Sequence, residues 1–159
     1  MSIAKALQIL GLTLLISSCQ RTAIYDVGTQ TPNIPGQKNE LKDDLQFMTI
    51  AYRDLYEEEI PVSVLETMRK AYVSFGDKAL VVDEIVQSLL LNPDLELPTQ
   101  QEIADDPGAF ISQTYKRFFL RDASDFELAF WESQLAEDES LTAQDIYYVF
   151  MTSSEYKYY

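Results

Sequence analysis

The sequence predicts an all-α protein, with about six main helices packed into one domain over residues 40–159. Three observations support this fold class. From Glu40 onward, apolar residues recur at the three- and four-residue spacing of an amphipathic helix. Residues typical of helix N-termini precede several of these runs. No segment combines two-residue apolar alternation with flanking turn residues, the pattern typical of a strand.

Each predicted helix has an apolar stripe of its own. In chain order the stripes are Leu41, Leu45, Met48, Tyr52 and Leu55; Val64, Met68, Ala71, Tyr72 and Phe75; Val82, Ile85, Val86, Leu89 and Leu90; Ile111, Tyr115, Phe118 and Phe119; Leu128, Trp131 and Leu135; and Ile146, Val149 and Phe150. Pro61 suits a first helical position, and Asp77 and Asp106 suit N-caps. Capping boxes are predicted at Thr99 with Glu102, at Ser124 with Glu127 and, in an aspartate variant, at Thr142 with Asp145.

The stripes are predicted to form two duplicated three-helix units, residues 43–95 and 106–156. In the first two helices of each unit, matched positions are separated by one constant interval, and the pairs are Phe47 with Phe110, Tyr52 with Tyr115, Arg53 with Lys116, Leu65 with Leu128, and Met68 with Trp131. In the third helix a two-residue shift is needed, after which Ile85 matches Ile146 and Leu90 matches Met151. Because identities are few, the repeated apolar pattern supports the prediction. The alternative is that any two amphipathic segments can be aligned in this way.

The N-terminal segment, residues 1–19, has the pattern of an export signal. A short basic region ends at Lys5, and the apolar run that follows, residues 6–16, is shorter than the roughly 20 residues that span a bilayer. The run ends in Leu15-Ile16-Ser17-Ser18-Cys19, which closely resembles the lipobox of bacterial lipoproteins. The resemblance implies that residues 1–18 are a cleaved signal peptide and that Cys19 carries the lipid. Because Gln20 stands where aspartate would signal inner-membrane retention, the resemblance also implies, for a Gram-negative source, lipid anchoring at the outer membrane, facing the periplasm or the cell surface.

Residues 19–39 are predicted to be an acylated N-terminus and a flexible tether. Gly28, Pro32, Pro35 and Gly36 interrupt a polar segment that has no apolar periodicity. About 20 flexible residues have a root-mean-square reach of roughly 25 Å. The segment would therefore hold a small domain away from the lipid headgroups.

The composition excludes several classes of function. The chain has 12 Lys and Arg, 26 Asp and Glu, no His and one Cys, for a net charge of −14. Histidine-dependent catalysis, His/Cys zinc sites and an intrachain disulfide are excluded, and the sparse glycines form no phosphate-binding or EF-hand pattern. Removing residues 1–18 takes away Lys5 and no acidic residue, so the charge becomes −15. This charge opposes nucleic acid and anionic lipid. The negative charge keeps the protein soluble or, alternatively, attracts a partner with a basic surface.

The second unit resembles a known helical pattern. The residues are the run Tyr115–Arg121, then Glu127 and Trp131, and finally Phe150–Tyr156. They are similar to the helical domain of cyanobacterial phycobilisome linker polypeptides and related bacterial modules. This sequence departs from that pattern at position 120, where it has leucine and glycine is usual, and at position 123, where it has alanine and proline is common. The resemblance implies an all-helical scaffolding or docking role.

Two groups of residues are candidates for a site. The acidic runs Glu57-Glu58-Glu59 and Glu137-Asp138-Glu139 could supply paired acids for glycan hydrolysis or ligands for a cation, although charged turns between helices explain them better. Tyr156, Tyr158 and Tyr159 are candidate partner-binding residues, because tyrosine is frequent in interface hot spots; burial of the rings is the alternative.

The sequence thus predicts a non-enzymatic, membrane-anchored lipoprotein, an accessory or docking subunit of a bacterial envelope complex. Its predicted partners are the membrane, through the lipid on Cys19, and other envelope proteins, but not nucleic acid. No catalytic residue, cofactor or metal ion is predicted. The alternative is an Asp/Glu-dependent hydrolase acting on cell-wall glycan.

Overall fold

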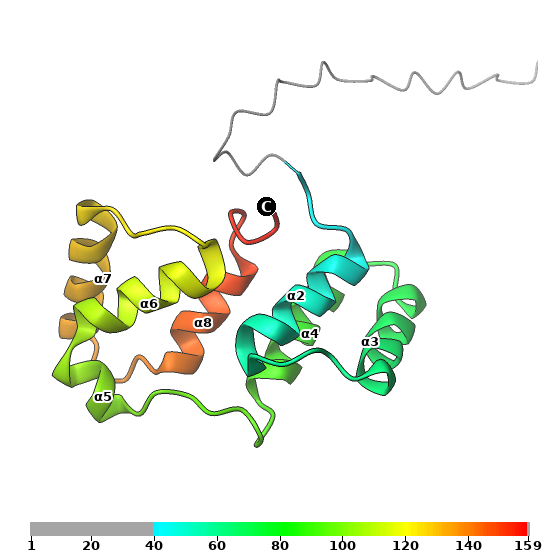
Figure 1. Ribbon diagram of the computed structural model, residues 1–159, viewed down its shortest axis with the longest axis horizontal. Coiled ribbons are helices and arrows are strands. Elements are labelled where there is room, and N and C mark those ends of the chain that lie inside the picture. The colour runs from blue at the N-terminus through cyan, green and yellow to red at the C-terminus, as the bar shows by residue number, and fades with distance from the viewer. Residues whose placement is uncertain (1–39, 159) are drawn as a thin grey trace, which may run out of the picture. The chain divides into compact units, whose positions relative to one another are not determined.

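The computed structural model describes residues 40–158, and in this part of the chain the fold is all-α, as predicted (Figure 1). The helices are α2 (Asp44–Tyr56), α3 (Val62–Ser74), α4 (Lys78–Leu90), α5 (Gln100–Asp105), α6 (Pro107–Phe119), α7 (Asp125–Glu137) and α8 (Ala143–Thr152). The predicted signal peptide (1–18), the tether (19–39), Cys19 and Tyr159 lie outside the described residues. No helix within residues 40–158 is long and apolar enough to cross a membrane.

The helix count departs from the prediction of about six, because the described residues contain a seventh helix, α5. Thr99 begins α5 through the predicted capping box with Glu102. Asp106 then ends α5 and also caps α6, accepting a hydrogen bond from the Ala109 amide at 2.9 Å. Pro107 is the first residue of α6, a position where its missing N–H costs nothing. Asp106 and Pro107 therefore separate two helices, α5 and α6, in a region where the apolar pattern predicts one.

The predicted start signals otherwise hold. Ser124 and Thr142 form complete capping boxes, and Asp77 caps α4. Pro61 is the N-cap of α3 rather than its first residue, because the helix begins at Val62. Asp43 with Gln46 makes a further capping box, at the start of α2. These caps satisfy amide groups that a helix N-terminus leaves without intrahelical partners.

Two helices end in left-handed backbone. The C-caps of α2 and α6, Glu57 and Leu120, have φ of 57° and 54°. Glycine favours this conformation because it has no Cβ to clash with the carbonyl oxygen. A leucine in this conformation keeps a Cβ that glycine would lack, so Leu120 is a strained C-cap.

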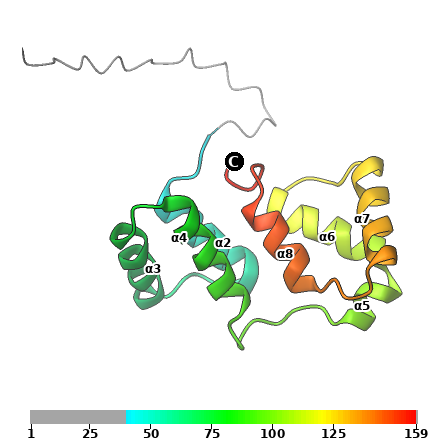
Figure 2. The ribbon, with the colours of Figure 1, turned by 180° about the vertical axis from the view of Figure 1, so that it is seen from behind.

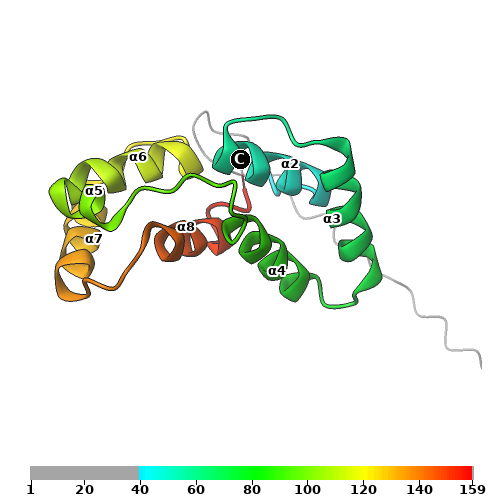
Figure 3. The same ribbon diagram turned by 90° about the horizontal axis from the view of Figure 1, so that it is seen from below.

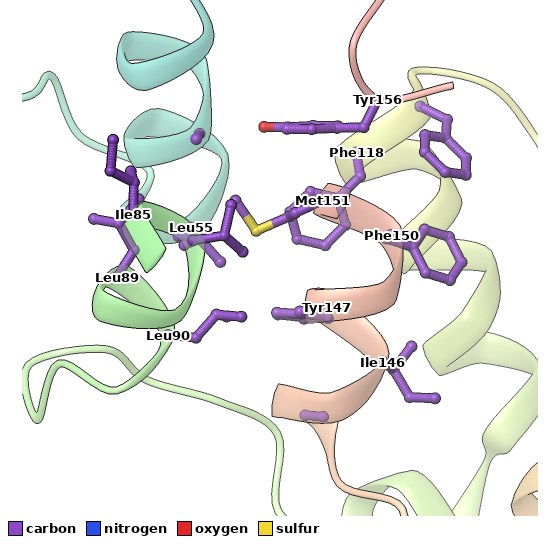
Figure 4. Close-up of a cluster of buried hydrophobic side chains, with 14 of the residues drawn as sticks. Leu55, Ile85, Leu89, Leu90, Phe118, Ile146, Tyr147, Phe150, Met151 and Tyr156 are labelled. Atoms are coloured by element: carbon purple, nitrogen blue, oxygen red, sulfur yellow. The ribbon is translucent and has the colours of Figure 1, made fainter. Parts of the chain in front are cut away.

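Helices α2, α3 and α4 pack together, and α5, α6 and α7 form a second group with α8. The two groups meet chiefly where α4 packs against α8, and Figures 2 and 3 show these two helices adjacent between the groups. Figure 4 shows Leu55 and Leu90 on one side of this junction, facing Tyr147 and Met151 of α8 on the other. One apolar core therefore includes residues from both groups.

The core is rich in stacked and edge-to-face rings. The Phe118 ring centroid lies 4.9 Å from that of Tyr147 and 5.8 Å from that of Tyr156, and Phe119 stacks on Phe150 at 4.9 Å. The fully buried large side chains are Tyr156, Phe118, Phe150, Met48, Ile111, Ile146, Met151, Val86 and Thr114. Aromatic pairs in these geometries add stability beyond their burial, by about 0.5–1.5 kcal/mol each.

Several predicted stripe positions are exposed instead of buried. Leu41, Leu45, Phe75 and Val149 are each more than 45% exposed. Leu41 precedes α2 and Phe75 follows α3, so neither is held by a helix against the core. Helices α3 and α7 contain no fully buried residue, because each packs as an outer helix and keeps much of its surface in solvent.

Candidate functional site

A groove of about 980 Å³ lies between the end of α2, the start of α6 and the segment 91–99 that connects α4 to α5. Figure 3 shows this connecting segment running between the two helix groups. The groove is lined by Tyr52, Leu55, Tyr56, Glu57, Glu58, Asn92, Asp94, Leu95, Glu96, Leu97, Pro98, Glu102, Asp106, Ala109, Phe110, Gln113, Arg117 and Tyr147. We name this feature the α2–α6 groove.

Buried apolar and aromatic side chains form the base of the α2–α6 groove. Leu55, Phe110 and Tyr147 are each less than 10% exposed, and the Phe110 and Tyr147 rings stack with centroids 6.1 Å apart. Burial raises the pKa of Tyr147, so its phenol stays neutral at physiological pH. The base is therefore formed by residues of the buried core.

A pair of tyrosines on α2 forms one wall. Tyr52 and Tyr56 stand one helical turn apart and stack, with ring centroids 4.3 Å apart and an interplanar angle of 22°. The Tyr56 hydroxyl donates a hydrogen bond to the Leu89 carbonyl at 2.8 Å, and burial raises the Tyr56 pKa. This bond to α4 holds the pair against the groove.

The rim is strongly acidic. Six carboxylates line the α2–α6 groove, those of Glu57, Glu58, Asp94, Glu96, Glu102 and Asp106. The basic residue among the lining residues is Arg117. The rim thus has a formal charge of −5, six negative charges and one positive.

Three of these carboxylates are engaged in the fold. Glu57 accepts a hydrogen bond from the Arg117 guanidinium at 2.6 Å, and Asp106 caps α6. Glu102 accepts hydrogen bonds from the amide and the hydroxyl of Thr99, both at 2.8 Å, and these bonds lower the Glu102 pKa. Their role is structural.

The other three carboxylates, of Glu58, Asp94 and Glu96, are exposed. Among residues 40–158 they make no side-chain hydrogen bond and no ion pair. Nor do any three or more His, Cys, Asp or Glu side chains in this part of the chain converge as a metal site. Three exposed carboxylates without an ion pair therefore border the groove, and they do not gather around one point as metal ligands would.

Arg121 forms a second polar cluster, at the end of α6. Its guanidinium donates two hydrogen bonds to Glu127, at 2.7 and 2.9 Å, and two to Glu155, also at 2.7 and 2.9 Å. It also lies over the Tyr115 ring, 4.9 Å from the centroid. These bonds raise the Arg121 pKa and lower that of Glu127 to about 2. Arg121 thus ties the end of α6 to α7 and to the segment after α8.

The candidate tyrosines occupy different environments. Tyr156 is fully buried: its ring contacts Phe47 and Phe118, and its hydroxyl donates to Asp54 at 2.8 Å. The prediction that Tyr156 lies on a partner-binding surface is therefore wrong, because the ring completes the core. Tyr158 is 38% exposed and its backbone pairs with that of Leu41 in an isolated antiparallel bridge.

The two acidic runs are also separated in role. Glu57 and Glu58 line the α2–α6 groove, whereas Glu137, Asp138 and Glu139 do not and are exposed at the end of α7. There Asp138 accepts hydrogen bonds from Ser140, which lower its pKa and close the turn. This second run is a capped turn between helices.

Sequence reasoning missed the groove. Its walls come from residues 52–58, 92–98 and 102–117, which only the fold brings together. Two signals were present, the tyrosines one turn apart on α2 and the acidic, proline-bounded segment from Pro93 to Pro98. No protein-family model matches the chain, and no curated protein or solved structure is significantly similar to it.

Proposed function

We propose that this protein is a non-enzymatic lipoprotein that holds a docking domain at the bacterial envelope, and that the α2–α6 groove is where its partner docks. The observation that supports docking most strongly is the groove itself, with a buried aromatic base and three carboxylates that make no hydrogen bond or ion pair within residues 40–158. Surfaces that combine a preformed aromatic base with unused polar groups are typical of recognition sites.

Anchoring depends on the resemblance of residues 15–19 to a lipobox. Two or three acyl chains on Cys19 would hold the protein stably on a membrane, because each buried methylene contributes about 0.8 kcal/mol. The domain itself repels anionic lipid, since the chain after residue 18 has a charge of −15. In this proposal the lipid sets the location and the domain selects the partner.

We also propose that the domain arose by duplication of a three-helix unit. The interval from the start of α2 to the start of α6 equals the interval from the start of α3 to the start of α7, and α8 follows α4 at nearly the same interval. The left-handed C-caps, Glu57 and Leu120, are separated by that interval as well. The groove is lined by α2 from one unit, by α6 from the other and by the connecting segment, so docking would require both three-helix units together.

The alternative, hydrolysis of cell-wall glycan, has one observation in its favour: carboxylates and tyrosine rings border the same groove. Glycoside hydrolysis needs one carboxylic acid with a raised pKa beside a second carboxylate. Among residues 40–158, the carboxyl group whose pKa is raised by burial is that of Asp54, which faces Tyr156 and does not line the groove. Docking is therefore the better supported function.

The test combines localisation with partner capture. We expect Cys19→Ala to abolish incorporation of an alkyne-tagged fatty acid and to release the protein from the membrane fraction. Partners cross-linked to the anchored protein should be lost when Glu58, Asp94 and Glu96 are changed together to the amides. Equal fatty-acid labelling of the Cys19→Ala variant would contradict the anchor, and glycan cleavage that those three substitutions abolish would contradict docking.

A further inference from the structure

We infer that the α2–α6 groove binds a short lysine- or arginine-containing segment of its protein partner, with a basic side chain against the Tyr52–Tyr56 pair. This inference rests on the proposed docking function and adds the chemistry of the ligand. It follows from three properties of the groove: its charge, its aromatic wall and its size.

The negative charge of the groove favours a positively charged ligand. The rim has a formal charge of −5. The guanidinium of Arg117, which could attract an anion, is already paired with the Glu57 carboxylate, with a nitrogen–oxygen distance of 2.6 Å. The carboxylates that remain come from two different segments, Glu58 after α2 and Asp94 and Glu96 between α4 and α5. A basic segment lying in the groove could therefore be contacted by carboxylates of both segments. A neutral glycan would gain nothing from this charge, and nucleic acid would be repelled.

The tyrosine pair offers a specific place for a cation. A guanidinium or ammonium group within about 6 Å of an aromatic centroid is attracted by the electron-rich ring face. Tyr52 and Tyr56 are preordered by their own stacking and by the bond from Tyr56 to Leu89. This chain uses the same contact internally, because Lys42 lies 3.7 Å from the Tyr156 centroid and Arg121 lies 4.9 Å from that of Tyr115.

The size of the groove and the spacing of its charges favour a peptide over a free ion. A volume of about 980 Å³ is at the upper end of the roughly 300–1,000 Å³ of small-molecule sites. Since the described carboxylates do not converge as a metal site, several cations spaced along a chain match them better than one ion. Leu95, Leu97 and Pro98 are partly buried and offer apolar contacts between the charges.

The test uses the full chain in a neutral detergent and a fluorescein-labelled octalysine peptide, with octaglutamate and a chitin oligosaccharide as comparison ligands. Fluorescence anisotropy measures affinity. The groove variant has Glu58→Gln, Asp94→Asn and Glu96→Gln. The control variant has Glu66→Gln, Glu137→Gln and Glu139→Gln, three exposed residues that do not line the groove. Both variants lose three negative charges, so the nonspecific electrostatic attraction between the peptide and the protein is the same in the two variants.

We expect octalysine to bind the wild type at low salt and to bind more weakly as salt screens the rim. The groove variant should lose about tenfold in affinity, and the control variant less than about twofold. Tyr52→Leu, which leaves the charge unchanged, should also weaken binding. Equal affinities of the groove and control variants would overturn the inference, and so would binding of the chitin oligosaccharide in place of octalysine.

The two proposals fail separately. If partners cross-link to the anchored protein at the groove but octalysine does not bind there, the ligand chemistry is wrong and docking stands. If octalysine binds at the groove but no partner depends on it in cells, the docking function is contradicted instead.

Discussion

Tyr156 is predicted to be a structural residue, which can be tested by removing one oxygen atom. In Tyr156→Phe the ring stays in place, but the Asp54 carboxylate loses the hydroxyl that donates to it at 2.8 Å. Asp54 is partly buried, and burial already raises its pKa. Removing one partner of a buried hydrogen bond to a charged group costs about 1–3 kcal/mol. We therefore expect the free energy of unfolding to fall by that amount.

Tyr156→Ala should cost more, because it also removes a ring that is fully buried between Phe47 and Phe118. Replacing a buried aromatic residue by alanine typically costs about 3–5 kcal/mol through lost burial and the cavity left behind. The Lys42 ammonium, which lies over the ring and donates to the Tyr156 carbonyl at 2.5 Å, would also lose its aromatic neighbour.

Urea unfolding followed by far-ultraviolet circular dichroism measures both effects. Tyr158→Phe is the matched control, since Tyr158 is 38% exposed, and we expect it to change stability by less than about 0.5 kcal/mol. If Tyr156→Phe were as stable as the wild type, the hydrogen bond to Asp54 would not contribute as argued. If Tyr156→Ala bound its partner poorly at unchanged stability, Tyr156 would be a contact residue after all.

Three further predictions concern the helix ends and the termini. Leu120→Gly should stabilise the protein by about 0.5–1 kcal/mol in the same urea assay, because φ is 54° there and the side chain is 77% exposed; a loss of stability would contradict the left-handed cap. The Glu127 pKa is lowered to about 2, chiefly by hydrogen bonds from Arg121, so its ionised form stabilises the fold above its ordinary pKa of 4.5, and this contribution is lost as pH falls from 4.5 towards 2. Glu127→Gln, which keeps a capping side chain, should flatten the pH dependence of stability over that range by no more than about 1 kcal/mol, because solvent screens the pair; an unchanged pH profile would contradict it. Deleting residues 157–159 should lower the melting temperature by a few degrees in a thermal scan, because it removes the Lys157 carbonyl that accepts from the Lys42 amide at 2.9 Å; an unchanged melting temperature would show that this link is dispensable.

The helices could be predicted from the sequence because their signals are local. Capping residues such as Ser124 and Thr142 and the three- to four-residue apolar spacing act within one or two turns, and the structure follows them. Helix α5 was not counted because it has six residues and one buried residue, Ile103, and so has no apolar stripe, although its capping box was predicted. Burial was harder to predict, since it depends on which helices lie outermost: α3 has a regular apolar stripe, yet no fully buried residue.

The candidate site could not be predicted for a related reason. Tyr52, Asp94 and Phe110 are far apart in sequence, and their meeting at one groove follows from how the two helix groups pack. The burial of Tyr156 likewise depends on Phe47 and Asp54, which come from the first described helix, at the other end of the domain's sequence. Arg121 and Glu127, which the sequence pattern also singled out, lie outside the groove, and their paired hydrogen bonds are a local contact between the end of α6 and the start of α7.

Site-specific photo-cross-linking in living cells tests whether a partner docks at the α2–α6 groove of the anchored protein. A photoreactive amino acid replaces Gln113, an exposed residue that lines the groove, in one strain and Glu66, exposed on α3 and outside the groove, in another. We expect a discrete cross-linked partner from position 113 alone, identifiable by mass spectrometry as having a contact segment that contains lysine or arginine, and its loss in the Cys19→Ala background. The same adduct from both positions, or an adduct from position 113 that persists unchanged without Cys19, would contradict docking at the groove.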